Sequence, residues 1–409
     1  MTTTINNEHN KHNVPNKREQ NQTCLDSAER EGLRPKGNVP NLRFPEFQGE
    51  WKEHKLEDIT AEIGDGIHAT PIYDDNGTFY FVNGNNISEY GIIITATTQK
   101  VTEEEALRNN ASALNSYSIL LSINGTVGNV ALYKNESIML GKSACYINVS
   151  SNINRNYIFY YLMMPKCQFY FTSELTGTTI KNLSLKSVRK TKVLLPNANE
   201  QSKIARLFDA INERIATQNK IIDKLQSLIK GLRVGLMQIE NGNIVHLGEI
   251  AQIYQPQTIS STELTEDGFL VYGANGIIGK YKQYNHKTEQ ICITCRGNTC
   301  GMVNYTKPMS WITGNAMVIN TDEHQNKVCK RYLYHYLSAY NFNSLISGSG
   351  QPQIVRTPLE QLKVTLPTFL EQKQKATFLD KIQGKIEICN KALNLYLQQK
   401  QYLLRQMFI

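Results

Sequence analysis

The 409-residue sequence lacks any run of 18 apolar residues, which excludes a transmembrane helix. Its first 40 residues are polar and have no apolar core segment, so they are not a secretory signal. The eight cysteines follow no disulfide framework, which is typical of reduced thiols in the cytoplasm. The sequence therefore predicts a cytoplasmic protein that has no membrane partner.

Motifs of catalysis and cofactor binding are also missing. The sequence has no Asn/Asp-Pro-Pro-Tyr/Phe motif of adenine methyltransferases and no glycine-rich cofactor loop. Gly141-Lys142-Ser143 ends like a phosphate-binding loop, but Glu136 stands where that loop needs glycine. Gly273, Gly276 and Gly279 do not have the spacing of a dinucleotide-binding loop. We expect no catalytic residue and no bound cofactor on this chain.

Two other patterns are better explained without special chemistry. Cys292 and Cys295, with Cys300 nearby, resemble half of a zinc site, but no second pair follows at zinc-finger spacing. Their segment is strand-like, so we expect buried or free thiols and no metal. His68 follows Asp65, but no nucleophile is paired with them, so a hydrogen-bonding loop histidine is expected.

The residues that are present indicate a folded protein of two or three domains, with 40% hydrophobic and 20% charged residues. The net charge of +8 is unevenly distributed. Residues 199–238 carry 7 basic and 4 acidic side chains and residues 370–409 carry 7 and 3, whereas residues 1–50 and 51–198 are balanced. Such a surplus permits an anionic partner.

The same two basic segments have the clearest periodicity. Their apolar residues recur at alternating spacings of four and three, which is the a/d seam of a coiled coil. We expect two long helices that pack on each other, with an intermolecular dimer as the alternative. The predicted residues of the helix–helix and subunit interface are Ile204, Phe208, Ile211, Ile215, Gln218, Ile222, Leu225, Leu379, Ile382, Ile386, Cys389, Leu393 and Tyr396.

The chain also contains an internal repeat. Residues 192–196 followed by Glu200-Gln201 match residues 363–367 followed by Glu371-Gln372, at the offset of 171 that also relates the two helical segments. A repeat of this length is a duplicated domain rather than a solenoid. Short β-branched and aromatic runs that end in Gly/Asn clusters predict β-rich domains. The predicted fold class is therefore α+β, with each β-rich domain followed by a long helix.

This organisation resembles the specificity subunit of type I restriction–modification systems over residues 39–409. Residues 38–51 are similar to the start of that family's first target-recognition domain, and residues 349–354 and the Leu-Pro-x-x-x-Glu-Gln junctions are similar to its passage from domain to helix. The resemblance implies two β-rich target-recognition domains and an antiparallel coiled coil of the two helices. The implied segments are a disordered N-terminal extension at 1–38, target-recognition domain 1 at 39–198, a central conserved helical region at 199–240, target-recognition domain 2 at 241–369 and a C-terminal conserved helical region at 370–409.

The resemblance further implies that each domain reads one half of a bipartite site in double-stranded DNA, while the helices fix the spacing. It implies that two methyltransferase subunits dock on this chain and that nuclease–translocase subunits join them. S-adenosylmethionine, ATP and Mg would bind to those partners. The 1–38 extension departs from the family pattern, and a disordered tail and an upstream start codon are the two explanations.

Base edges in the major groove are read by amide, hydroxyl and basic side chains, which we sought in the predicted loops. The first-domain candidates are His68, Thr70, Asn83, Asn85, Asn86, Lys142, Ser143, Thr178, Thr179, Lys181, Lys186, Arg189 and Lys190. The second-domain candidates are Gln255, Gln257, Tyr272, Asn275, Arg296, Asn298, Asn315, Gln351 and Gln353. For any one of them, a turn-forming role is the alternative, and plain solvation is the alternative for the basic run at 181–192.

Two other functions compete with DNA recognition. A structural or adhesive protein would use the helix pair to oligomerise and would be indifferent to DNA. An enzyme with an unrecognised site would be active as the isolated chain.

Overall fold

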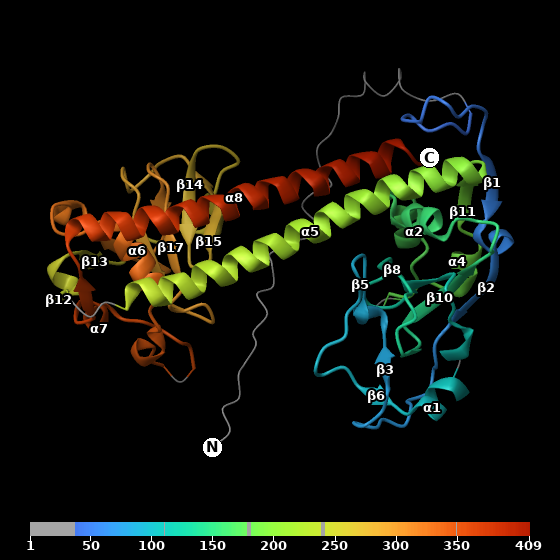
Figure 1. Ribbon diagram of the computed structural model, residues 1–409, viewed down its shortest axis with the longest axis horizontal. Helices are drawn as coiled ribbons and strands as arrows, with labels where there is room; N and C mark the ends of the chain where they lie inside the picture. The colour runs from blue at the N-terminus through green and yellow to red at the C-terminus, as the bar shows by residue number, and fades with distance from the viewer. Residues whose placement is uncertain (1–36, 110, 178–180, 239–241, 349) are drawn as a thin grey trace. The chain divides into compact units, whose positions relative to one another are not determined.

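The computed structural model describes residues 37–109, 111–177, 181–238, 242–348 and 350–409 (Figure 1). The chain divides into two compact units, residues 1–213 with 397–409 and residues 214–396. Each unit contains one β-rich domain and parts of two long helices, α5 (Ala198–Met237) and α8 (Phe369–Gln406). The predicted disordered extension lies outside the described residues except at 37 and 38. Among the described helices, none is both long and apolar enough to cross a membrane.

The first unit is built around a four-stranded antiparallel sheet. Its strands, in spatial order, are β2 (Thr60–Asp65), β10 (Ala144–Val149), β7 (Ser118–Ser122) and β8 (Val130–Leu132). A smaller sheet has the order β6 (Lys100–Val101), β3 (Phe79–Val82) and β9 (Ile138–Leu140). Two further antiparallel pairs are β1 (Lys52–Lys55) with β11 (Lys192–Leu195) and β4 (Ile87–Ser88) with β5 (Gly91–Ile92). The short helices are α1 (Glu103–Arg108), α2 (Arg155–Met163), α3 (Pro165–Ser173) and α4 (Leu185–Arg189).

The second unit repeats this plan with fewer additions. Its four-stranded sheet has the order β13 (Gln252–Tyr254), β19 (Ala316–Asn320), β16 (Ile291–Thr294) and β17 (Val303–Tyr305). Its smaller sheet has the order β15 (Gly276–Tyr281), β14 (Phe269–Gly273) and β18 (Trp311–Ile312). The remaining elements are the pair β12 (Asn243–His246) with β20 (Lys363–Leu366) and the helices α6 (Lys330–Ala339) and α7 (Arg356–Glu360).

The sheet topology confirms the duplication predicted from the sequence. In both smaller sheets the central strand has one antiparallel and one parallel neighbour, β9 for β3 and β18 for β14. One inner strand of each large sheet, β7 in the first unit and β16 in the second, also alternates between two cores. Ile291 and Ile293 face the core that includes the helices, whereas Cys292 faces the core beside the smaller sheet. Leu121 and Leu120 make the same division in the first unit.

The two long helices run antiparallel within each unit, which confirms the predicted fold class. In the first unit, Phe208 near the start of α5 and Leu404 near the end of α8 belong to one core. In the second unit, the Gln218 side chain donates to the Cys389 carbonyl at 3.1 Å, and Lys375 donates to the Leu236 carbonyl at 2.8 Å. The predicted seam residues are buried or half-buried along both helices.

Each passage from domain to long helix depends on one buried glutamine. Gln201 donates to the Pro196 carbonyl at 2.9 Å and accepts from the backbone N–H of Asn154, the residue that precedes α2, at 3.0 Å. Gln372 donates to the Pro367 carbonyl at 3.0 Å and accepts from the N–H of Cys329, which precedes α6, at 2.9 Å. These glutamines therefore satisfy the same main-chain groups at the start of two helices in both units.

The residue that precedes this glutamine behaves differently in the two units. Glu200 is fully buried and forms a two-pronged ion pair with Arg43, whose side chain is 13% exposed, at 2.7 Å. This contact raises the pKa of Arg43. Glu371 is exposed and instead accepts from the backbone N–H of Thr368 at 2.9 Å. The segment that contains Arg43 also binds α8, because the Leu42 N–H donates to the Gln406 carbonyl at 2.9 Å.

One aspartate on each long helix holds the neighbouring short helix. In the first unit, Asp209 accepts from the Tyr160 hydroxyl at 2.7 Å and from the Asn156 amide at 2.9 Å. In the second unit, the equivalent residue Asp380 binds Arg331 and accepts from His335 Nε2 at 2.9 Å.

Candidate nucleic-acid interface

Five loops of the second domain meet at one end of its large sheet. The Gln255 side chain donates to the Gly314 carbonyl at 3.1 Å, and the Thr294 hydroxyl donates to the Ala274 carbonyl. The backbone N–H of Gly297 donates to the Pro352 carbonyl at 2.9 Å. These contacts join the loops at 255–257, 273–276, 295–299, 313–315 and 347–353 into a single surface.

The first domain assembles the equivalent loops by the same kind of contact. The backbone N–H of Gly84 donates to Ser143 Oγ at 2.8 Å, and the Thr126 hydroxyl donates to the Gly84 carbonyl at 3.1 Å. The Ile67 N–H donates to the Leu140 carbonyl at 2.9 Å. The loops at 66–70, 83–86, 123–126, 141–143 and 176–182 therefore form one surface too. Residues 178–180 of the last loop lie outside the described part of the chain.

The two loop surfaces share a main-chain frame. Asn124 pairs with Asn182 in an isolated antiparallel bridge, and Arg296 pairs with Gln353 in the same way. The glycines that follow, Gly125 and Gly297, have φ of 72° and 85°, a left-handed conformation that glycine adopts without strain. The frame makes Arg296 and Asn124 equivalent positions, so the two domains present different side chains from one backbone geometry.

Many predicted DNA-contact residues have exposed side chains, and all of these except Lys186 in α4 and Lys190 directly after it lie on the two loop surfaces. This set includes Arg296, which lies just after the end of β16. The exposed candidates are His68, Thr70, Asn85, Lys142, Lys181, Lys186, Lys190, Gln255, Gln257, Asn275, Arg296, Asn298, Asn315 and Gln351.

Other predicted residues are occupied inside the protein. The Ser143 hydroxyl donates to Asn83 Oδ1 at 2.9 Å, and the Asn86 side chain donates to the Ile93 carbonyl at 2.9 Å, so these side chains shape a loop. Gln353 is half-buried in the bridge with Arg296. Thr178 and Thr179 lie outside the described residues.

The structure places Tyr272 away from the loop surface. Its side chain is 6% exposed and belongs to the core beside the smaller sheet, and its hydroxyl accepts from the Lys307 N–H at 3.1 Å. A DNA contact by this side chain does not fit its position, because strand alternation turns it inward. The loop residues that follow it do reach the surface.

The predicted basic run of the first domain divides into two groups. Lys181, Lys186 and Lys190 are exposed and available to phosphates. Arg189 donates to the Ile63 carbonyl at 2.7 Å, so it ties α4 to β2. Lys192, in the adjoining strand β11, forms an exposed ion pair with Glu53 at 2.8 Å.

Asn124, Thr126 and Asn182 complete the first loop surface and are not among the residues predicted from the sequence. A usable signal was present, since the run that ends in Asn124-Gly125 aligns with the run that ends in Arg296-Gly297. In the alignment of the two repeats, the candidates Arg296 and Gln353 correspond to Asn124 and Asn182, so the repeat itself predicts these two residues.

The cysteine pattern does not form a metal site. Cys292 and Cys295 lie in different cores, so their thiols do not converge. Burial raises the pKa of Cys292, which disfavours the thiolate that zinc requires. No group of three His, Cys, Asp or Glu side chains that could hold a metal occurs among the described residues. His68 Nε2 and Asp65 Oδ2 form a hydrogen bond of 2.8 Å on an exposed loop.

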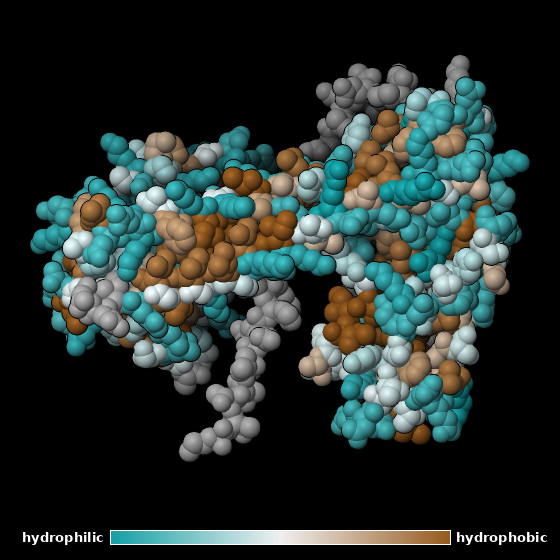
Figure 2. All heavy atoms as spheres, viewed as in Figure 1, coloured by the Kyte–Doolittle hydropathy of each residue, from teal (hydrophilic) through white to brown (hydrophobic). Residues whose placement is uncertain are grey.

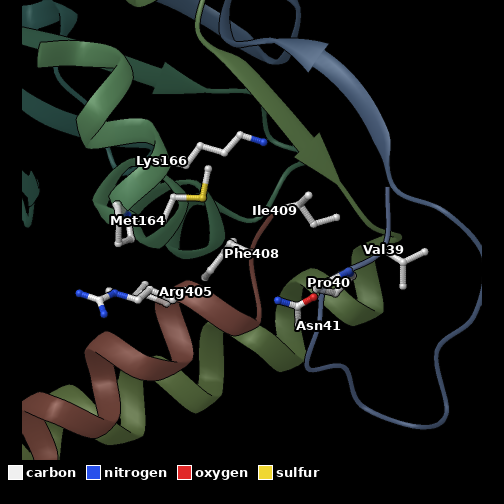
Figure 3. Close-up of a pocket in the computed structure, with 10 residues that line it drawn as sticks. Val39, Pro40, Asn41, Met164, Lys166, Arg405, Phe408 and Ile409 are labelled. Carbon is white, nitrogen blue, oxygen red and sulfur yellow. The ribbon is translucent and has the colours of Figure 1, made fainter. Parts of the chain in front are cut away.

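A cleft of about 300 Å³ lies elsewhere in the first unit, where α8 ends (Figure 3). Figure 3 shows side chains from three segments around it, the residues after Gly37, the start of α3 and the end of α8. Phe408 and Met164 at this cleft belong to the first core. The cleft therefore lies where the N-terminal segment packs beside the end of α8. None of the predicted DNA-contact residues lines it.

Comparison with known proteins agrees with this architecture. The family described as "Type I restriction modification DNA specificity domain" matches residues 48–227 and again residues 240–397. The chain belongs to this family. The type I restriction enzyme EcoprrI specificity subunit of Escherichia coli is 24% identical over 329 residues, which cover 75% of this chain and 80% of that protein. The MjaVIII specificity subunit of Methanocaldococcus jannaschii is 22% identical over 396 residues, which cover 86% and 89%.

Solved structures from type I restriction–modification systems share the fold. The crystal structure of the type I restriction–modification S subunit from M. genitalium has a TM-score of 0.62 at 18% identity and covers 91% of this chain and 99% of that one. A structure from work on complex assembly and conformational transition of a type I system has a TM-score of 0.51 at 15% identity and covers 88% and 97%. This likeness and the family match confirm the resemblance inferred from the sequence.

Proposed function

We propose that this chain is the DNA-reading subunit of a type I restriction–modification complex. Each loop surface reads one half of a bipartite site in double-stranded DNA. The observation that carries the proposal is the repeated loop frame, in which Asn124 and Arg296 occupy equivalent positions with different chemistry. Such a pair fits two half-sites of different sequence, because amide and guanidinium groups favour different base edges.

Exposed lysines supply the sequence-independent part of binding. Lys142, Lys181 and Lys186 lie on or beside the first loop surface. Contacts of this kind to phosphates hold the duplex in register and release counterions, so affinity should fall steeply with salt.

The long helices present a surface for partner subunits. Figure 2 shows apolar side chains gathered over the helix pair in the second unit. Exposed apolar residues there recur at heptad spacing, Ile221 with Leu228 on α5 and Ile388 with Leu395 on α8. Contiguous exposed apolar surface on a helix is typical of protein interfaces. In our proposal, two methyltransferase subunits dock on the helices, and nuclease–translocase subunits join through them.

The chemistry then belongs to the partners. In this proposal the chain has no catalytic residue and binds no cofactor or metal. S-adenosylmethionine, ATP and Mg act on the partner subunits, and the complex works in the cytoplasm.

Methylation by the assembled complex tests the proposal. The chain would be expressed with the methyltransferase subunits of its own system in cells that lack other adenine methylation, and methylated adenines would be mapped across the genome. We expect one bipartite motif that disappears when this chain is omitted. Scattered methylation without a motif, or an unchanged motif without this chain, would contradict the proposal.

A further inference from the structure

The hairpin β4–β5 connects the first loop surface to the end of α8. Its turn contains Glu89, whose Oε2 accepts a hydrogen bond from Lys400 Nζ at 2.8 Å. The two residues are 311 positions apart in the sequence. The Lys400 side chain is 2% exposed and that of Glu89 is 35% exposed. A lysine buried to this degree is stable only with a charged partner, because the ammonium loses its hydration.

The second unit has neither part of this ion pair. Lys400 occupies a seam position of α8, and the equivalent seam position of α5 is Ile229, which is 4% exposed in the second core. The loop at 273–276 leads directly into β15, without a short hairpin between them. The hairpin and the buried cation therefore occur together in one unit and are replaced together in the other.

The hairpin is fixed to a loop of the candidate interface. Asn86 and Ile93 flank it and exchange two hydrogen bonds, from the Ile93 N–H to the Asn86 carbonyl at 2.7 Å and from the Asn86 side chain to the Ile93 carbonyl at 2.9 Å. Asn86 Oδ1 also accepts from the Asn83 N–H at 3.0 Å, and the Asn129 side chain donates to the Ile87 carbonyl at 3.0 Å. A shift of Glu89 would therefore move the loop at 83–86.

We propose that Glu89 and Lys400 are positioning residues that hold the loop at 83–86 against α8 and thereby sharpen selectivity at the half-site of the first domain. This inference rests on the proposed function. Hydrogen bonds to bases discriminate only when the reading loop is held within a fraction of an ångström, because their strength falls steeply with distance and angle. The loops of the second domain are held without such an ion pair, so selectivity at the second half-site should not depend on Glu89 and Lys400.

The test uses the assembled complex and the double variant E89Q/K400M. The change of Lys400 to Met removes the buried charge and keeps the apolar stem, and Ile229 shows that an apolar residue fits this seam position. The single variant E89Q leaves the cation without its partner and should melt several degrees lower. The matched control is E53Q, which breaks the exposed Glu53–Lys192 pair of the same domain.

Selectivity would be measured as methylation rates on a library of sites with single-base changes in either half-site. We expect E89Q/K400M to melt like the wild type and to lose roughly tenfold in selectivity at one half-site, the one that Asn124→Ala also affects. Selectivity at the other half-site, and at both half-sites in E53Q, should be unchanged. Unchanged selectivity at both half-sites, or an equal loss at both, would overturn the positioning role. A wild-type complex without half-site preference would overturn the proposed function itself.

Discussion

The two domains have the same sheets and loop frame, but they are fastened to the long helices by different chemistry. Gln201 and Gln372 share two contacts because both bind main-chain groups whose positions the fold determines, and Gln372 adds a longer bond to the Lys327 carbonyl at 3.3 Å. Asp209 binds neutral partners, whereas Asp380 binds Arg331 and His335. The comparison teaches that a side chain bound to main-chain groups is kept in both domains, because the shared fold fixes the positions of those groups. A contact between two side chains can differ, because both partners can change together.

The largest expected difference between the units concerns Arg43. Arg43→Ala leaves Glu200 buried without its partner, which should cost about 3–5 kcal/mol of unfolding free energy in the first unit. The matched change in the second unit, Glu371→Ala, removes only an exposed cap and should lower the unfolding free energy far less. Hydrogen exchange resolved by domain would measure both. Equal losses would contradict the comparison.

Arg296 should control one base pair of the second half-site. Arg296→Ala should reduce discrimination at that position by about 1–3 kcal/mol and leave the first half-site unchanged, because its guanidinium is exposed on the second loop surface alone. Asn124→Ala should have the reverse pattern. Competition binding with single-base variants of the site measures the effect. Arg356→Ala is the control, since this exposed arginine pairs with Glu360.

The two junction glutamines should be equivalent in energy. Gln201→Ala and Gln372→Ala each leave a backbone N–H and a carbonyl at a helix start without a partner, so each should cost about 1–2 kcal/mol in its own unit. Denaturant unfolding followed by hydrogen exchange gives the two values. A difference above about 1 kcal/mol between them would show that the junctions are not equivalent.

The smallest expected effect is a pH dependence confined to the second unit. Burial and the nearby Arg233 and Arg331 lower the pKa of His335 despite its bond to Asp380. Arg233 Nε donates to His335 Nδ1 at 3.1 Å, so the neutral ring carries its proton on Nε2 and donates it to Asp380. The unfolded chain then binds more protons than the native state once the pH falls below about 6.5, and stability decreases by at most about 1.4 kcal/mol per pH unit.

Asp380 adds to this loss only in stronger acid. Burial alone would raise the pKa of Asp380, but its bonds with His335 and Arg331 hold that pKa below its ordinary value. Its contribution to stability is therefore present above the unfolded pKa and disappears as the pH falls through the lower folded pKa. His335→Gln keeps both hydrogen bonds without titrating and should flatten the slope near pH 6. The pH dependence that remains in this variant should come from His286, because burial also lowers the pKa of His286. The first unit has Tyr160 at the equivalent position and should show no such slope.

Features with a local period or a repeated motif could be predicted from the sequence. The heptad spacing located the seam, and the Leu-Pro-x-x-x-Glu-Gln motif located both junctions. Loop composition found Arg296 and Asn315, because a strand end beside glycine is exposed in almost any sheet. Tyr272 was misjudged because a bulge next to it shifts the strand register, and register depends on the partner strand. The Glu89–Lys400 pair was missed because no local pattern relates residues 311 positions apart.

The end of α8 and the residues that follow it have a consequence for synthesis on the ribosome. Leu404, Met407 and Phe408 belong to the core of the first unit, together with residues such as Tyr157 and Phe208. At translation rates of roughly 5–20 residues per second, the domain that emerges first must wait about 10–40 s for these side chains. The second domain has no such delay, so the half of the chain that is translated first should be the last to reach its native state, and chaperones should engage it in the interval.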